Sequence, residues 1–238
     1  MEENKPKRYR RTKADIENGI KKAAKSIILK KGFSGMTVLD IIKRANIEPI
    51  TFYTRYRNLE EFYDNFVREY DYWFNDVLKM SQDKTYDQER YIEIFRNLFD
   101  VLKENSVMLE LLRWEVNEAN TITKRSAMNR EVQTLPLTTI YGNLFKDNDV
   151  DFVAISALLI AGVYYLNLHR KCSPFCGIDV STEEGRSRLM NAIETLTDKL
   201  FLERNNAQKR YQDKIASIAD KMRQKGFSKE DIVFCLSD

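Results

Sequence analysis

Histidine is almost absent from this sequence, since His169 is the only one among 238 residues. Most acid–base and nucleophilic enzyme sites use histidine to carry a proton, so the usual histidine-based catalytic sites are mostly excluded. The sequence also contains neither a glycine-rich phosphate-binding loop nor a Gly-x-Ser-x-Gly motif. Its acidic residues fall on the polar faces of predicted helices, where solvation is their ordinary role. We therefore expect no enzyme activity and no cofactor.

Cysteine is scarce too, and the three cysteines do not suit the disulfide framework of a secreted protein. Cys172 and Cys176 follow His169 closely in the sequence, whereas Cys235 lies far away. A structural zinc site needs a fourth ligand that this cluster lacks, so we predict no metal. Free thiols without a special role are the simplest interpretation, and metal or redox sensing by Cys172 and Cys176 are the alternatives.

Glycine and proline are few, at eight and four residues, and 32% of the residues are charged, which favours a helical protein. The apolar share of 43% is large enough for a real hydrophobic core. No uninterrupted apolar run reaches the roughly 18 residues of a membrane span. The basic N-terminus has no apolar segment behind it, unlike a signal peptide. We therefore expect a cytoplasmic protein with no membrane partner.

The segment from 37 to 56, TVLDIIKRANIEPITFYTRY, predicts two short helices joined by a tight turn. Thr37 suits the N-cap of the first helix, and Asp40 three residues later completes a capping box. The inward stripe of this helix consists of Val38, Ile41 and Ile42. Asn46 suits the end of the helix because it tolerates the left-handed conformation. Pro49 suits the first position of the second helix, which has no backbone donor to lose.

The second helix, predicted from 49 to 56, has an outer face without an acidic residue. Phe52 and Tyr56 are four residues apart and share the inward face. The residues that point away from the core are Ile50, Thr51, Tyr53 and Thr54, with Arg55 at the edge. Such a face suits a helix in the major groove of DNA, against phosphates and thymine methyl groups. A helical hairpin with no nucleic-acid role is the alternative.

This part of the chain resembles the TetR family of one-component repressors over about its first sixty residues. The segments that carry the resemblance are GFSGMTVLDIIKRANI (32–47), TFYTRY (51–56) and NLEEF (58–62). The resemblance implies that Thr37, Thr51 and Tyr53 contact phosphates or bases.

Three residues depart from the family pattern. Asn46 replaces a usual glycine, which is physically benign. Ile50 replaces a common glycine, which stiffens the helix and adds an apolar contact. Leu59 replaces a usual lysine, which removes an expected phosphate contact.

A basic segment, KPKRYRRTK (5–13), directly precedes the predicted head. The net charge of the whole chain is only +3, so affinity for nucleic acid must come from such local placement of charge. A basic tail can act only as a solubilising segment. Next to a helix-turn-helix it can also follow the DNA backbone or enter a minor groove. The complete set of predicted DNA contacts is Arg8, Arg10, Arg11, Thr12, Thr37, Pro49, Ile50, Thr51, Tyr53, Thr54 and Arg55.

The hydrophobic periodicity predicts an all-α fold with three parts. Residues 1–57 form a three-helix head, whose first helix runs from Asp15 to Lys31. Residues 58–202 form a larger domain for effector binding and dimerisation, which begins with one long helix from 58 to about 80. Residues 203–238 form a C-terminal helical extension of unknown role. If the long helix carries the head, tilting it moves the recognition helix.

Aromatic residues in the larger domain predict an effector pocket, because such pockets are mostly aromatic with a few polar groups. The run LLRWE (111–115) resembles a pattern in the C-terminal domains of some TetR-like regulators. The alternative is that Trp114 belongs to the core and Glu115 pairs with a nearby arginine. The predicted pocket residues are Tyr70, Trp73, Phe95, Phe99, Trp114, Glu115, Tyr141 and Tyr165.

The most apolar segment of the chain, residues 150–168, predicts a helix that is buried from two sides. Its own domain covers one side, and a second subunit best explains the other. With the helix that follows Thr182, it resembles the pair that forms the four-helix dimer bundle of TetR-like proteins. A hairpin within one chain is the alternative. The predicted interface residues are Ala157, Ala161, Tyr164, Leu168, Leu189, Ile193, Leu196 and Leu200.

Together these features predict a homodimeric DNA-binding transcriptional regulator. It is a repressor that a small-molecule effector releases from a palindromic operator. Its partners are double-stranded operator DNA, a second copy of the chain and an unidentified small molecule. The alternative is a helical dimeric ligand-binding or scaffold protein with a degenerate head, which acts through protein partners.

Overall fold

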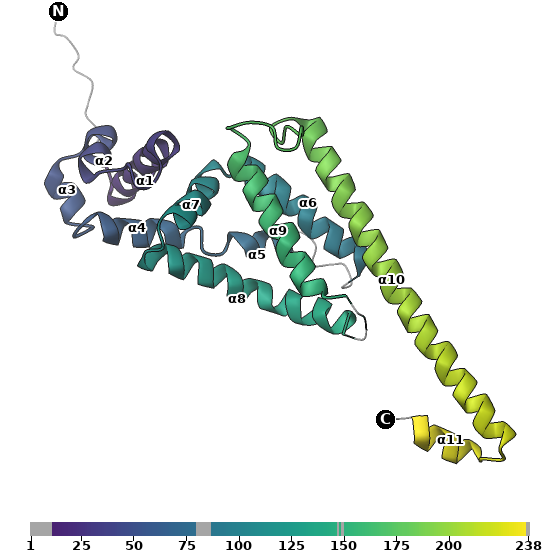
Figure 1. Ribbon diagram of the computed structural model, residues 1–238. Coiled ribbons are helices and arrows are strands. Elements are labelled where there is room, and N and C mark those ends of the chain that lie inside the picture. Colours follow the sequence, from purple (N-terminus) through teal and green to yellow (C-terminus); the bar gives the residue numbers. More distant parts are fainter. Residues whose placement is uncertain (1–10, 80–86, 147, 149, 237–238) are drawn as a thin grey trace, which may run out of the picture. The chain divides into compact units, whose positions relative to one another are not determined.

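The computed structural model describes residues 11–79, 87–146, 148 and 150–236. Within these ranges the chain forms eleven helices and no strand (Figure 1). This result confirms the predicted all-α fold. The predicted contacts Arg8 and Arg10 lie outside the described residues.

The helices lie in chain order and are joined mostly by short connections. The first six are α1 (Lys13–Lys31), α2 (Val38–Ala45), α3 (Pro49–Tyr53), α4 (Leu59–Arg68), α5 (Trp73–Lys79) and α6 (Gln88–Glu104). The other five are α7 (Ser106–Asn117), α8 (Thr121–Leu144), α9 (Phe152–His169), α10 (Glu183–Gln224) and α11 (Lys229–Leu236).

The contacts divide the chain into two compact units. Unit 1 contains Met1–Met80 and Asn97–Thr134, and unit 2 contains Ser81–Arg96 and Leu135–Asp238. Helices α6 and α8 each contribute residues to both units. The functional boundary predicted after residue 57 remains a prediction. The boundary predicted after residue 202 falls inside the continuous helix α10.

The helices of the head begin and end where the sequence provides caps. Thr12 and Asp15 form a capping box at the start of α1, and Thr37 and Asp40 form another at the start of α2. Asn46 ends α2 in the left-handed conformation, with φ 50° and ψ 60°. An N-cap of the Thr37 type contributes about 1 kcal/mol to helix stability, so the predicted start of α2 has a clear local cause.

The core of unit 1 is an aromatic cluster beneath the head. The rings of Phe52 and Phe62 lie 6.0 Å apart, and those of Phe62 and Phe66 lie 5.6 Å apart. Phe33 contacts Phe66 at 6.3 Å and is 1% exposed. Because these rings come from the α1–α2 connection, α3 and α4, their burial joins the head helices into one body.

The helix predicted from 58 to 80 is interrupted after α4. Residues 69–72 form turns, and the chain becomes helical again in α5. The amide of Gln133 donates to the backbone carbonyl oxygen of Asp71 at 2.6 Å, so this carbonyl has a side-chain partner inside the turn. Tyr70 inside the turn and Trp73 directly after it are both buried. Sequence periodicity could not reveal the break, because the apolar stripe continues through it.

A second aromatic cluster forms the core of unit 2. The Phe145 and Phe152 rings are stacked 4.1 Å apart, and the Phe201 ring lies edge-on to Phe145 at 5.1 Å. Tyr91 and Tyr141 complete the cluster, with ring centroids 5.3 Å apart. This cluster holds the end of α8, the start of α9 and the middle of α10 together.

Helix α9 leaves much of its apolar surface uncovered within a single chain. By length and composition it could cross a membrane, although only 17% of it is buried inside the chain. Leu158 is 74% exposed. Helix α8 continues from Thr121 to Leu144 with Pro136 inside it.

Candidate nucleic-acid interface

The head presents α3 as an exposed helix that is anchored by two buried rings. Phe52 is fully buried and Tyr56 is nearly so, whereas Ile50 and Tyr53 are 68% and 51% exposed. The outward and inward faces therefore lie as predicted for a recognition helix. Pro49 occupies the start of α3 and is exposed. Helix α3 itself contains no acidic residue that would repel a phosphate.

Arg55 and Thr54 lie at the C-terminal end of α3 and contact its last turn. The Arg55 guanidinium donates to the carbonyl oxygen of Thr51 at 2.7 Å, and the Thr54 hydroxyl donates to the same oxygen at 3.2 Å. These bonds satisfy a helix carbonyl that has no partner in the ladder. A guanidinium has five N–H groups, so Arg55 retains donors for a phosphate or a base.

Arg11 joins the N-terminal segment to the turn of the helix-turn-helix. Its guanidinium donates to the carbonyl oxygens of Ala45 and Asn46, both at 3.2 Å. Sequence reasoning assigned Arg11 to DNA contact only and missed this role. The bonds fix the point at which the basic segment leaves the head, because Ala45 and Asn46 end α2.

The charge of the only acidic residue in α2 is compensated. Asp40 accepts hydrogen bonds from the Lys31 ammonium group at 3.1 Å and from the Thr37 hydroxyl at 2.9 Å. Lys31 and Thr37 both hold the pKa of Asp40 below its usual value. The carboxylate therefore stays ionised while a neighbouring cation offsets its repulsion of DNA. The Thr37 hydroxyl already forms the N-cap hydrogen bonds of α2, so its first role is to stabilise the start of this helix. Thr37 is also exposed.

Leu39 is an exposed residue of the head that sequence reasoning missed. Its side chain is 58% exposed on α2, whereas Ile41, Ile42 and Ala45 of the same helix are buried. The signal was present in the sequence, because Leu39 falls outside the inward stripe at helical spacing.

The residues predicted to line an effector pocket are divided between the two units. Tyr70, Trp73, Phe99, Trp114 and Glu115 belong to unit 1, and Phe95, Tyr141 and Tyr165 belong to unit 2. All except Glu115 and Tyr165 are buried. The pocket stays a prediction.

Trp114 and Glu115 make the contacts of the packing alternative. The Trp114 ring is stacked on Phe33 at 4.8 Å with an interplanar angle of 2°. Its indole N–H donates to the carboxylate of Glu118 at 2.9 Å. Glu115 accepts two hydrogen bonds from the guanidinium of Arg130. The Phe33 contact was not foreseen, and it packs α7 directly against the head within unit 1.

The predicted dimer residues lie on α9 and on the first half of α10. Ala157, Ala161 and Leu196 are exposed in the single chain. The half-buried members are Tyr164, Leu168, Leu189 and Leu200. Ile193 is only 6% exposed, so its own subunit already covers it. The sequence missed Leu158, which is 74% exposed on α9, compared with 46% for Leu196.

Two cysteines, Cys172 and Cys176, lie in the part of the chain whose side chains are described. Cys172 and Cys176 are free and exposed, in the connection between α9 and α10. Among the described residues, no group of three or more His, Cys, Asp or Glu side chains is arranged to hold a metal ion.

Comparison with known proteins gives two curated relatives of this chain. It is 29% identical over 141 residues to IcaR, the HTH-type negative transcriptional regulator of the biofilm operon icaADBC in Staphylococcus epidermidis, with 59% of this chain and 70% of IcaR covered. It is 26% identical over 105 residues to an uncharacterised HTH-type transcriptional regulator of Haemophilus influenzae. That match covers 44% of this chain and 56% of the relative's length. No protein-family model matches the chain.

Solved structures share the fold at low sequence identity. Reduced NemR of E. coli superposes with a TM-score of 0.56 at 16% identity, covering 76% of this chain and 96% of NemR. A TetR-family transcriptional regulator of Haemophilus influenzae has a TM-score of 0.54 at 18% identity, covering 78% of this chain and 98% of that regulator. FadR of Bacillus subtilis, in complex with stearoyl-CoA, has a TM-score of 0.51 at 15% identity, covering 77% of this chain and 97% of FadR. The resemblance to TetR-family transcriptional regulators is thus confirmed, and this chain has their fold.

Proposed function

We propose that this protein is a homodimeric DNA-binding transcriptional regulator that represses its target by occupying a palindromic operator. The observation that carries the proposal is the exposed, acid-free face of α3, held in place by the buried rings of Phe52 and Tyr56. The names of the relatives support regulation of transcription, and IcaR is a negative regulator. Each subunit places α3 in the major groove of one half-site.

The chemistry of α3 determines how it reads DNA. Its outer face offers no Asn, Gln or Lys for bidentate hydrogen bonds to bases. Ile50 and the Thr51 methyl group therefore read thymine methyl groups, and Arg55 contacts a guanine or a phosphate. Tyr53 donates its hydroxyl to a phosphate, which positions the helix without specifying the sequence. The basic N-terminal segment adds affinity that depends on salt.

The exposed apolar surface of α9 supports a dimer. An apolar helix of 18 residues of which only 17% is buried is an unfavourable surface for an isolated chain in water. A second copy that covers α9 and the first half of α10 removes this surface from water. Two-fold symmetry then places two heads on half-sites related by a palindrome.

Release from the operator follows from linkage between a ligand site and the heads. A small molecule that binds between residues 60 and 200 favours a dimer in which the spacing of the heads no longer matches the half-sites. The buried aromatic residues favour an apolar or planar ligand. FadR of Bacillus subtilis was solved with stearoyl-CoA, which is consistent with an apolar ligand in this fold.

Selection of bound fragments from a random DNA pool tests the proposal. A repressor enriches one palindrome, and its affinity for that DNA falls steeply as salt increases. The second candidate function, a scaffold with a degenerate head, is favoured by the replacement of a common family glycine by Ile50 and of a usual lysine by Leu59. It predicts neither enrichment nor a preferred sequence. A monomeric protein that ignores every oligonucleotide would refute the proposed function.

A further inference from the structure

The second half of α10 carries an apolar stripe with little cover from its own chain. From Glu203 to Gln224 the only buried residue is Ala219. Helix α11 folds back toward α10 at this end (Figure 1). The stripe repeats at three- and four-residue spacing and consists of Ala207, Tyr211, Ile215, Ile218 and Met222. Tyr211 is 66% exposed and Ile218 is 39% exposed. A helical face of this kind is typical of a helix that packs against another helix.

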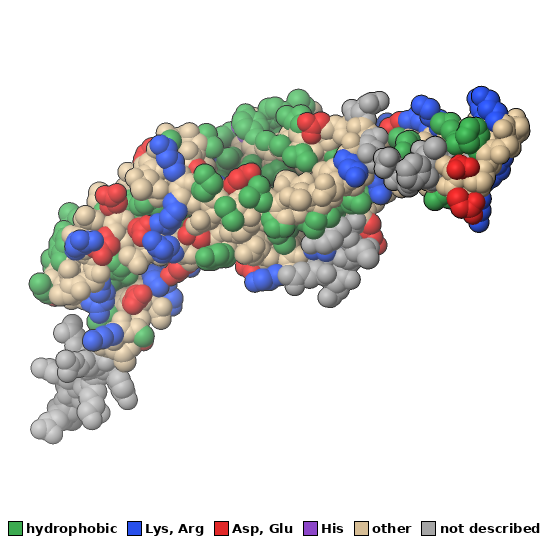
Figure 2. All heavy atoms as spheres, turned by 90° about the horizontal axis from the view of Figure 1, so that it is seen from below, with side chains coloured by type: hydrophobic (Ala, Val, Ile, Leu, Met, Phe, Trp, Pro, Cys, Tyr) green, Lys and Arg blue, Asp and Glu red, His purple; other side chains and the backbone are tan. Residues whose placement is uncertain are grey.

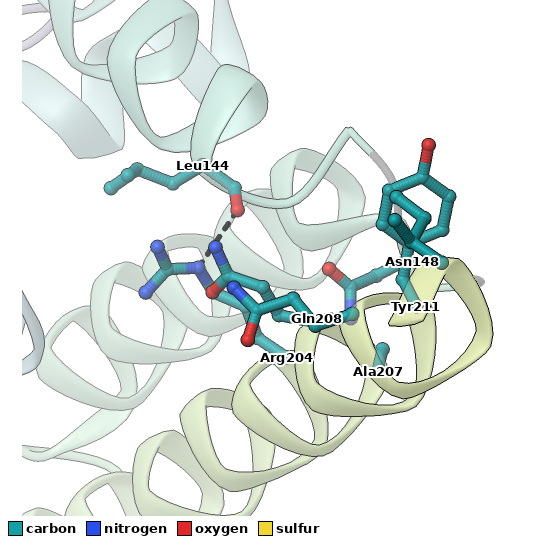
Figure 3. Close-up of a pocket in the computed structure, with 8 residues that line it drawn as sticks. Leu144, Asn148, Arg204, Ala207, Gln208 and Tyr211 are labelled. Carbon is teal, nitrogen blue, oxygen red and sulfur yellow. Dashed lines mark hydrogen bonds between the residues drawn. The ribbon is translucent and has the colours of Figure 1, made fainter. Parts of the chain in front are cut away.

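A groove opens directly over this stripe within unit 2. Its volume is about 600 Å³. Its floor on α10 includes Ala207, Gln208 and Tyr211 (Figure 3), and Gln212 and Ile215 also line it. Leu144, at the end of α8, and Asn148, in the connection to α9, form one wall. This wall is fixed to the floor, because the Arg204 guanidinium donates to the Leu144 carbonyl oxygen at 2.9 Å. The same guanidinium also lies over the Phe145 ring, at 5.9 Å from its centroid.

The segment around the groove is strongly basic. Residues 203–229 contain eight Lys or Arg and three Asp or Glu, a net charge of +5 in a chain whose total is +3. In Figure 2 the region at the right shows Lys and Arg side chains beside hydrophobic ones, together with a few Asp and Glu side chains. The three acids are largely used, because Glu203 pairs with Arg210 and Asp220 with Arg223.

Four lysines of this segment are available to form ion pairs with a partner. No ion pair within the described part of the chain involves Lys209, Lys214, Lys221 or Lys225. Lys214 and Lys221 are seven residues apart and share one flank of α10, beside the apolar stripe. Arg210 lies on the same flank, one turn before Lys214. The groove therefore combines an apolar stripe with the polar side chains of Gln208 and Gln212, and it has a positive border on one flank.

We propose that this groove is a docking site for an acidic amphipathic helix of a partner protein. Helix-in-groove binding places apolar side chains at positions i, i+3, i+4 and i+7 into such a channel, and the acidic flanks meet the basic border. This interaction is separate from the proposed contact with DNA, since it uses no residue of the head.

The charge and the shape of the groove disfavour other occupants. A second copy of residues 203–229 carries the same net charge of +5, so pairing of two such segments brings like charges together. Duplex DNA has no apolar side chains to cover the stripe. A bilayer is flat, whereas Leu144 and Asn148 raise one side of the groove above its floor.

Two synthetic helical peptides of about 21 residues, each with leucine at three- and four-residue spacing, test the proposal. One has glutamate on both flanks, and the other has lysine at the same positions. Fluorescence anisotropy measures the affinity of each peptide for the full-length protein. We expect the acidic peptide to bind at least about tenfold more tightly than the basic one, with a preference that salt weakens.

Variants locate the binding surface. Tyr211→Ser with Ile215→Ser should weaken acidic-peptide binding at least about tenfold, since both side chains form the floor. Asn206→Ser with Gln224→Ser, at exposed positions on the opposite side of α10, should leave it unchanged. Lys214→Glu with Lys221→Glu should reverse the preference toward the basic peptide. Circular dichroism verifies that each variant keeps its helical content.

Several results would overturn the proposal. Equal binding of the two peptides would show that the border does not select charge. A change in particle mass by sedimentation in the Tyr211→Ser, Ile215→Ser variant would identify a second copy as the occupant. Binding of duplex DNA or anionic vesicles through the same floor residues, without binding of the acidic peptide, would identify another class of partner. Operator binding measured on the same samples tests the proposed function separately.

Discussion

Phe52 allows the fold of the head and its contact with DNA to be separated by experiment. Its ring is fully buried, at 5.6 Å from the Tyr53 ring, 5.4 Å from Tyr56 and 6.0 Å from Phe62. Helix α3 has five residues, too few to be stable without packing. Phe52 is the only buried residue within α3 itself, so the position of the recognition helix depends strongly on this side chain.

The expected cost of Phe52→Ala is about 3–5 kcal/mol, the range for removing a buried phenylalanine. This free energy corresponds to a factor of about a hundred to several thousand in the folded population of the head. Domains of ordinary size are stable by about 5–15 kcal/mol, so the loss removes a large share of the total. We expect operator binding to be lost together with the native head.

Urea denaturation followed by tryptophan fluorescence is the suitable assay. The chain has two tryptophans, and both Trp73 and Trp114 belong to unit 1, so their signal reports on the unit that contains the head. Tyr53→Phe is the matched control, because it changes the adjacent exposed residue and keeps the ring that contacts Phe52. The control should keep the urea midpoint and weaken DNA binding about equally for all sequences. If the shift in urea midpoint of Phe52→Ala corresponds to a loss of less than about 1 kcal/mol in the free energy of unfolding, the packing argument is refuted.

Three further predictions concern DNA readout, the buried ion pair and pH. Replacing thymine by uracil in the operator removes only methyl groups, so gel-shift affinity should fall for the native protein and fall less for Ile50→Ala, which keeps only the Thr51 contact. Glu115→Ala leaves the Arg130 guanidinium buried without its partner and should cost about 3–5 kcal/mol in chemical denaturation. Asp40 has a lowered pKa, so its contribution to the cap of α2 is present above the usual pKa of roughly 3.9 and is lost as pH falls below it. Circular dichroism across acid pH should show a stability step that Asp40→Asn lacks.

Local signals explain why the head was predictable from the sequence. The caps at Thr37 and Asn46 and the proline at the start of α3 act over three or four residues. The inward positions of Phe52 and Tyr56 follow from helical spacing alone. Each of these features depends on neighbours in the sequence, so reading the chain was sufficient to place them.

The contacts between distant segments were not predictable in the same way. The stacking of Trp114 on Phe33 joins residues 81 positions apart, and no periodicity encodes such a pair. The bonds from Arg11 to the end of α2 and from Gln133 to Asp71 depend equally on tertiary packing. The candidate DNA face was therefore predictable, whereas the connections that hold it to the rest of unit 1 required the structure.

Helix α9 provides the last prediction, which concerns protein concentration. If a second copy covers its exposed apolar face, unfolding and dissociation are linked, and stability rises with concentration. For a dimer that unfolds to two chains, each tenfold dilution lowers the free energy of unfolding per dimer by about 1.4 kcal/mol. Thermal melts of the full chain over a hundredfold range of concentration measure this effect.

A leucine on the exposed face provides the variant for this test. Leu158→Glu places a charge on a side chain that is 74% exposed in the single chain, so the fold of one subunit should tolerate it. In the dimer the same charge is buried without a partner, which is costly. The variant should therefore sediment as a monomer and bind single half-sites weakly. Melting temperatures that stay constant on dilution, with Leu158→Glu still dimeric, would show that α9 is not the contact between subunits.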